Sequence, residues 1–102
     1  MNIPLPDKVG KDDFEDRVIS KLWPHMSDNG RFCTNLHITG GDFWYAMIGA
    51  ISGCHEAGYR IPETLLQEIE RENDECFETD DPIHGLLVRA VARVRSLDQT
   101  PQ

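Results

Sequence analysis

The chain has 102 residues, of which 27% are charged, and its formal net charge at pH 7 is −8. A chain of this length is expected to form a single domain, residues 1–102, with one hydrophobic core. Its longest nearly apolar run, residues 43–51, is far shorter than the ~18 residues that a membrane span needs. The opening MNIPLPDKVGKDD also lacks the apolar stretch of a signal peptide, so we expect no membrane association. Three cysteines without paired spacing argue against a disulfide framework and favour the cytoplasm.

The N-terminal region is predicted to combine an extended arm with a first helix. Two prolines exclude a helix over residues 1–11, which should form the arm. A helix is expected to begin at Asp12 or Asp13, because an aspartate can accept the free amides of a first turn. Pro24 should end or kink it, since the residue before a proline is pushed out of helical geometry. The apolar residues at helical spacing are Phe14, Val18, Ile19 and Leu22.

Residues 27–41 have a different pattern. SDNGR is typical of a turn, and in the following FCTNLHIT the apolar residues alternate with polar ones in the manner of a strand. Phe32, Leu36 and Ile38 share one parity. Because a lone strand would have no partner in a helical chain, we expect an irregular or short extended segment here.

Residues 43–57 are predicted to form the central helix of the core, because apolar residues occur almost all round it. The preceding TGGD indicates a sharp entry turn in which the threonine or the aspartate caps the helix. Gly49 and Gly53 lie one turn apart and lower helix propensity, so we expect a neighbouring helix to approach closely there. Gly58 should close the helix in left-handed geometry. An anion site at the entry turn is disfavoured, since Asp42 would repel an anion.

Two further helices are predicted, one over residues 61–77 and one that follows the capping sequence TDDP. The buried stripe of the first is expected to be Leu65, Leu66, Ile69, Cys76 and Phe77. That of the second is expected to be Ile83, Leu86, Leu87, Ala90, Val91, Val94 and Leu97. With a frayed tail at 98–102, the sequence predicts an all-α single domain of about four helices.

The negative charge is concentrated in residues 62–81, which contain nine acidic side chains and one basic one. This concentration argues against a nucleic-acid partner and favours a protein with a basic surface. On a helix, Glu68, Glu72 and Glu75 form one stripe, while Glu63, Glu70 and Asp74 lie on the opposite side. The predicted partner-binding set is Glu68, Glu72, Glu75, Glu70 and Asp74, although a merely solvated helix face is an equally good interpretation.

The functional hypothesis is therefore a small, acidic, non-enzymatic binding protein without a cofactor, such as an inhibitor, an immunity protein or an accessory factor. The alternative is a Mg²⁺-dependent nucleotide phosphohydrolase, in which the acidic stripe would face Asp13 and Asp16 of the first helix. A dimer is also expected, because two tryptophans, the apolar arm and the apolar last helix exceed what one core can cover. Arginines of the last helix, Arg89, Arg93 and Arg95, could pair with the acidic helix of the same or a second copy.

Two alternative sites involve cysteine and histidine. Cys33, His37, Cys54 and His55 include a Cys-x-x-x-His spacing suitable for zinc. Adjacent helical residues point about 100° apart, however, so Cys54 and His55 could hardly share one ion. Cys33 with His37 could form a nucleophile pair, but no third orienting residue is evident. We therefore expect neither a metal site nor a catalytic cysteine.

Overall fold

The computed structural model describes residues 3–97, and that part of the chain is helical with no β-strand. The predicted all-α class is confirmed, but five α-helices and a short 3-10 turn replace the expected four helices. The elements are α1 (Phe14–Leu22), the 3-10 turn η1 (Trp23–His25), α2 (Asp28–Thr39), α3 (Phe43–Glu56), α4 (Glu63–Cys76) and α5 (Pro82–Arg95). The predicted frayed tail, 98–102, lies outside the described residues.

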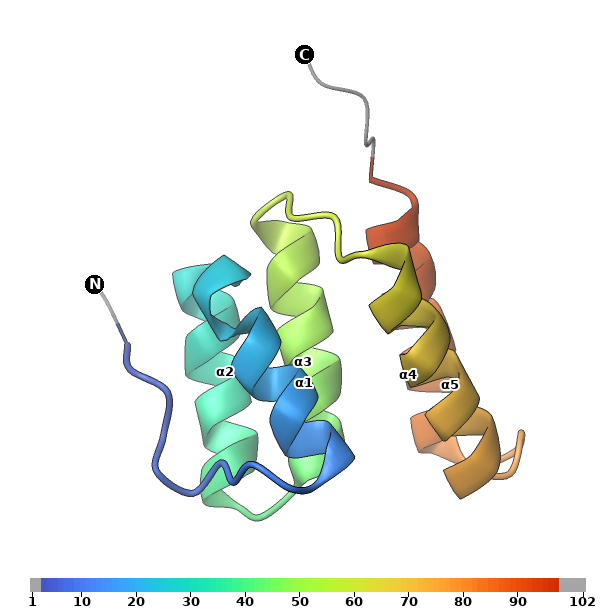
Figure 1. The fold of residues 1–102 in the computed structure, drawn as a ribbon, viewed down its shortest axis with the longest axis horizontal. Helices are drawn as coiled ribbons and strands as arrows, with labels where there is room; N and C mark the ends of the chain where they lie inside the picture. The colour runs from blue at the N-terminus through green and yellow to red at the C-terminus, as the bar shows by residue number, and fades with distance from the viewer. Residues whose placement is uncertain (1–2, 98–102) are drawn as a thin grey trace.

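Helix α3 is the centre of the fold, as its apolar sequence predicts. It packs against α1, α2 and α5, while α4 packs against α5. Figure 1 shows α1, α2 and α3 gathered together and α4 running alongside α5. The buried residues of α3 are Ala46, Met47, Ala50, Ile51, Gly53 and Cys54.

Helix α2 replaces the irregular or extended segment expected at 27–41, and that prediction was wrong. Ser27 caps the helix by accepting a hydrogen bond from the Gly30 amide at 3.0 Å. Its buried residues are Gly30, Thr34 and Ile38, which are spaced four apart on one face. Two of these three are small or polar, so the helical period was hidden, and the larger Phe32 and Leu36 produced an accidental alternation.

The expected close approach of a neighbouring helix at the glycines of α3 is confirmed. A Cβ placed on Gly30 of α2 would lie 2.5 Å from the Cα of Gly53. One placed on Gly49 would lie 3.1 Å from Thr34 Oγ1. Glycine is therefore required for α2 and α3 to lie this close together.

The TGGD turn closes α2 and leads into α3, which begins after Asp42 as predicted; the side-chain capping bond that was also predicted is not formed. The amides of Gly41 and Asp42 donate to the carbonyls of Ile38 and His37, at 3.0 and 2.9 Å. Gly41 has a φ of +81°, and together with these two hydrogen bonds it forms a Schellman motif at the end of α2. Asp42 precedes α3 but makes no side-chain capping bond. Gly58, with a φ of +76°, ends α3 as predicted.

The end of α1 differs from the expectation in its geometry. Trp23 keeps helical dihedral angles, φ −49° and ψ −49°, although it precedes Pro24. The helix narrows into the 3-10 turn, and the side chain of Arg31 donates to the carbonyls of Trp23 and Pro24 at 2.9 and 3.1 Å. These carbonyls are thus satisfied without the helix continuing.

Over residues 3–11 the arm is not helical, as predicted, but it is not extended throughout, because a turn at Asp7 and Lys8 lets the Val9 amide donate to the Pro6 carbonyl at 3.1 Å. The arm packs onto its own domain. Trp23 Nε1 donates to the Ile3 carbonyl at 2.9 Å, and the Gly10 amide donates to Asp16 Oδ2 at 3.0 Å. The arm's Ile3, Leu5 and Val9 are partly buried against the core. The arm therefore covers apolar surface that the sequence suggested was free for dimer formation.

Helices α4 and α5 begin close to their predicted positions. Asp81 caps α5 by accepting the Ile83 amide at 2.9 Å. The buried stripe of α4 was predicted correctly for Leu66 and Ile69, but Cys76 is exposed. Asn73 is buried in its place and donates from Nδ2 to the His84 carbonyl at 3.1 Å.

Candidate functional site

The acidic side chains of α4 fall into two sets, one facing α5 and one turned away from it. In the first set, Glu63 and Glu70 both bind Arg95 of α5, with Nη2 to carboxylate distances of 2.8 and 2.7 Å. Glu63 also pairs with Arg60 at 3.0 Å. Hydrogen bonds from Arg95 and then from Arg60 lower the pKa of Glu63. The proposed pairing between the last helix and the acidic helix is thus present for Arg95 within one chain.

Asp74 belongs to the same set because it contacts α5, although its side chain is 74% exposed. Its Oδ1 lies 2.9 Å from His84 Nε2, and the His84 side chain is largely covered. With Glu70, it gives two of the five predicted partner-binding residues a contact inside the chain. These two residues help to join α4 to α5, and they offer less free charge to a partner than the sequence suggested.

The outward set consists of Glu68, Glu72 and Glu75, which we call the outer acidic face. Glu75 is exposed and the other two are half-buried. Within residues 3–97, none of the three forms an ion pair with a lysine, arginine or histidine. Arg71, the one basic residue of α4, is exposed and likewise makes no ion pair within residues 3–97. Three carboxylates therefore remain for an external partner.

The pKa of Cys76 indicates a negative electrostatic potential on this side of the molecule. Its Sγ lies 3.8 Å from Glu72 Oε2. Desolvation raises the pKa of Cys76, and Glu72, Glu75 and Glu15 of α1 raise it further. Glu15 thus lies near enough to add its charge to the outer acidic face.

An aromatic cluster fixes the end of α4 against the rest of the domain. Trp44 of α3 meets Phe77 edge-on, with ring centroids 4.9 Å apart and an interplanar angle of 85°. The Trp44 ring also packs against Phe14 of α1, with ring centroids 6.3 Å apart and an interplanar angle of 31°. Because each ring belongs to a different part of the chain, the cluster holds the outer acidic face in a defined place.

The structure does not bring the cysteine and histidine candidates into a site. Cys33 is exposed on α2, whereas Cys54 is buried and its thiol lies 3.9 Å from the Leu22 carbonyl. Burial raises the pKa of Cys54 to about 12. His37 stacks on Tyr45, with ring centroids 5.9 Å apart. The raised pKa of Cys54 is the opposite of what an activated nucleophile needs, and within residues 3–97 neither cysteine forms a hydrogen bond with a histidine.

The carboxylates needed by the phosphohydrolase alternative are also not assembled. Over residues 3–97, no three His, Cys, Asp or Glu side chains are grouped so that they could hold a metal ion. Asp16 is buried and binds the Gly10 amide of the arm. Its second oxygen, Oδ1, is buried without a hydrogen-bond partner.

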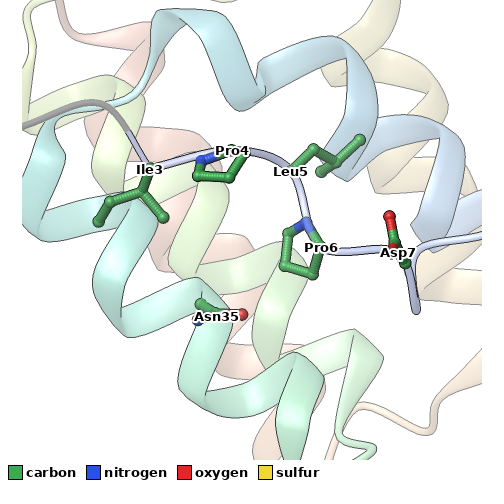
Figure 2. A pocket seen from close by; sticks show the side chains of 6 residues that line it. All are labelled: Ile3, Pro4, Leu5, Pro6, Asp7 and Asn35. Carbon is green, nitrogen blue, oxygen red and sulfur yellow. The ribbon is translucent and has the colours of Figure 1, made fainter.

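A second surface lies on the exposed side of α2. The sequence analysis did not predict it, because residues 27–41 were not expected to form a helix. Phe32 and Leu36 are the most exposed large apolar side chains of the described part, at 55% and 58%. Beside them the arm forms an open hollow of about 390 Å³, lined by Ile3, Pro4, Leu5, Pro6, Asp7 and Asn35. Figure 2 shows Asn35 of α2 across from the two prolines of the arm. The signal in the sequence was the spacing of Asn29, Phe32, Leu36 and Thr39, which fits one face of a helix.

Comparisons with known proteins give no match to a family model, to a curated protein or to a solved structure. Among the described residues, no helix has the length and apolar character required to cross a membrane.

Proposed function

We propose that the protein is a non-enzymatic binding module that docks a basic surface of a protein partner through the outer acidic face of α4. Inhibitors, immunity proteins and accessory factors act in this way, and a cytoplasmic setting agrees with three cysteines that remain free thiols. The observation that carries the proposal is the division of the α4 acids. Glu63 and Glu70 form ion pairs with Arg95, and Asp74 lies within hydrogen-bond distance of His84. In contrast, Glu68, Glu72 and Glu75 have no cationic partner within residues 3–97.

The physical role of such a face is to accelerate encounter. Charged surfaces of opposite sign raise the association rate of two proteins much more than they slow dissociation. Like charges one turn apart on a helix destabilise it by a few tenths of a kcal/mol per pair. The outer acidic face therefore has a small cost in the free protein, which binding to a basic surface would relieve.

The test begins with capture of a partner on immobilised protein at low salt, followed by mass spectrometry. Association of the purified partner is then measured by stopped-flow for wild type and for the triple variant E68Q/E72Q/E75Q. We expect the variant to fold normally and to associate more slowly. Wild-type association should also slow as salt rises, because exposed charges are screened beyond about 10 Å at 0.1 M salt.

A matched control separates a specific face from net charge. The triple variant D7N/D12N/D80N removes three exposed carboxylates that lie outside α4, so it changes the net charge by the same amount. It should associate nearly as fast as wild type. Equal rates for wild type and E68Q/E72Q/E75Q, or equal losses in the two triple variants, would show that α4 is only a solvated face.

A further inference from the structure

The outward side of α2 has the spacing of a helix-pairing seam. Asn29, Phe32, Leu36 and Thr39 follow one another at intervals of three, four and three residues, and all four are exposed. These are the intervals of the a and d positions through which two helices pack in a coiled coil. We call these four residues the α2 seam. The opposite face of α2, with Gly30, Thr34 and Ile38, is already buried against the rest of the domain.

The α2 seam contains no charged side chain. The charged residues of α2 are Asp28 and Arg31, which pair with each other at 3.2 Å at the start of the helix. The chain as a whole has a net charge of −8. Two copies of such a chain repel each other over most of their surface. Charged groups contact only the ends of the α2 seam: Asn29 Nδ2 donates to Glu56 at 3.5 Å, and Lys8 Nζ donates to the Thr39 carbonyl at 3.3 Å. The uncharged, apolar centre of the α2 seam, Phe32 and Leu36, is the place where a second copy can approach with the least repulsion.

The α2 seam is also complementary to itself. When two copies of α2 run in opposite directions, Phe32 of one copy faces Leu36 of the other, and Asn29 faces Thr39. The two apolar residues then form the centre of the contact and the two polar residues form its ends, as in protein interfaces generally. A two-fold axis relates the copies, which is the commonest symmetry of homodimers.

We propose that the protein self-associates through the α2 seam as an antiparallel, two-fold symmetric dimer. This inference is independent of the proposed function, because the α2 seam and the outer acidic face share no residue. Twelve helical residues span about 18 Å, so the contact is small and belongs with transient interfaces that bury less than about 1,200 Å². A monomer–dimer equilibrium is therefore expected instead of a permanent dimer.

The first test is sedimentation equilibrium of the full chain up to about 1 mM, the Kd range of weak complexes. Wild type should shift from monomer to dimer as concentration rises, and it should shift further at higher salt because salt screens the repulsion between copies. Partner binding by the outer acidic face should instead weaken with salt. The two proposals thus respond to salt in opposite directions, and the failure of one can be told from the failure of the other.

Substitutions locate the contact. F32S and L36S change side chains that are more than half exposed, so the monomer should remain folded by circular dichroism, and each variant should stay monomeric over the same concentration range. The control is V88S on α5, which removes an exposed apolar side chain of similar exposure, 49%, away from the α2 seam. It should dimerise as wild type does.

Cross-linking through Cys33 tests the direction of the helices without a change to the α2 seam. Cys33 is exposed beside the α2 seam, and C76S leaves it as the exposed thiol with Cys54 buried. In an antiparallel pair both copies of Cys33 lie on the same side of the contact, so a short bismaleimide should join them, and F32S should abolish the product. A monomeric wild type at every concentration and salt, unchanged dimerisation of F32S and L36S, or no cross-link between dimeric copies would overturn the proposal.

Discussion

The contact between α2 and α3 makes a sharp prediction for the substitution Gly30→Ala. The added Cβ would lie 2.5 Å from the Cα of Gly53 and 3.1 Å from Ser27 Oγ. Ordinary contact begins at 3.4 Å, and the closest neighbour is backbone, so α2 and α3 would have to separate by roughly 1 Å. Over-packing of this kind costs about 1–3 kcal/mol.

Helix propensity acts in the opposite direction, since alanine is favoured over glycine by about 1 kcal/mol in a helix. Gly30 is the third residue of α2, where part of this gain is lost because the first turn has few internal hydrogen bonds. We expect the over-packing cost to exceed the propensity gain, with a net loss of about 1–2 kcal/mol in the free energy of unfolding. Each kcal/mol should lower the melting temperature by about 4–8 °C in a domain of this size.

The matched control is Gly85→Ala in α5. A Cβ on Gly85 would meet only the mobile end of Arg89, at 3.5 Å, so the same substitution should stabilise the protein by up to about 1 kcal/mol. Urea unfolding followed by circular dichroism measures both effects, with the dependence on urea unchanged. Wild-type stability in the Gly30 variant, or a shift of the same sign in both variants, would refute the close helix approach.

Two further predictions concern ionisation. Maleimide labelling followed by peptide mapping should modify Cys33 fastest and Cys76 more slowly, because desolvation raises the pKa of Cys76. Cys54 is buried and its pKa is raised to about 12, so it should react only after unfolding. The Glu63–Arg95 pair should stabilise the fold at pH values above the ordinary glutamate pKa, and this stabilisation should disappear as pH falls through the lowered pKa of Glu63. The free energy of unfolding of Arg95→Gln should therefore be lower than that of wild type at neutral pH, and the two should converge in acid.

The amphipathic helices could be predicted from the sequence because large apolar side chains supply most of their buried faces. Val18, Ile19 and Leu22 mark α1, and Leu87, Val91 and Val94 mark α5 by the same periodicity. Both ends of α3 were also accessible to sequence reasoning, through the turn before it and Gly58 after it. In these elements the local pattern and the tertiary contacts favour the same structure.

The candidate site was predictable only in part, because sequence position gives the direction of a side chain but not its partner. The separation of the acids onto two sides of α4 was predicted from the helical period. The sequence predicted that an arginine of the last helix could pair with the acidic helix, but the 25 residues between Glu70 and Arg95 carry no local signal, so this particular pair could not be singled out. The buried Asn73 was missed for a related reason, since its hydrogen bond to the His84 carbonyl exists only once α4 and α5 have packed together.

Helix α2 was missed because its buried face carries small or polar side chains while its large apolar side chains are exposed. This arrangement also relates the buried face of α2 to its exposed face. Small side chains at Gly30 and Thr34 let α2 lie directly on α3, so the helix gains stability from close packing instead of from burying large apolar groups. Phe32 and Leu36 remain outside, where fully burying either side chain would contribute roughly 1.5–3 kcal/mol. A contact with a second copy can supply part of that burial at no cost to the internal packing. The tight inner face fixes the position of α2, and a fixed helix presents the α2 seam in one geometry, which is the condition for two copies to fit each other.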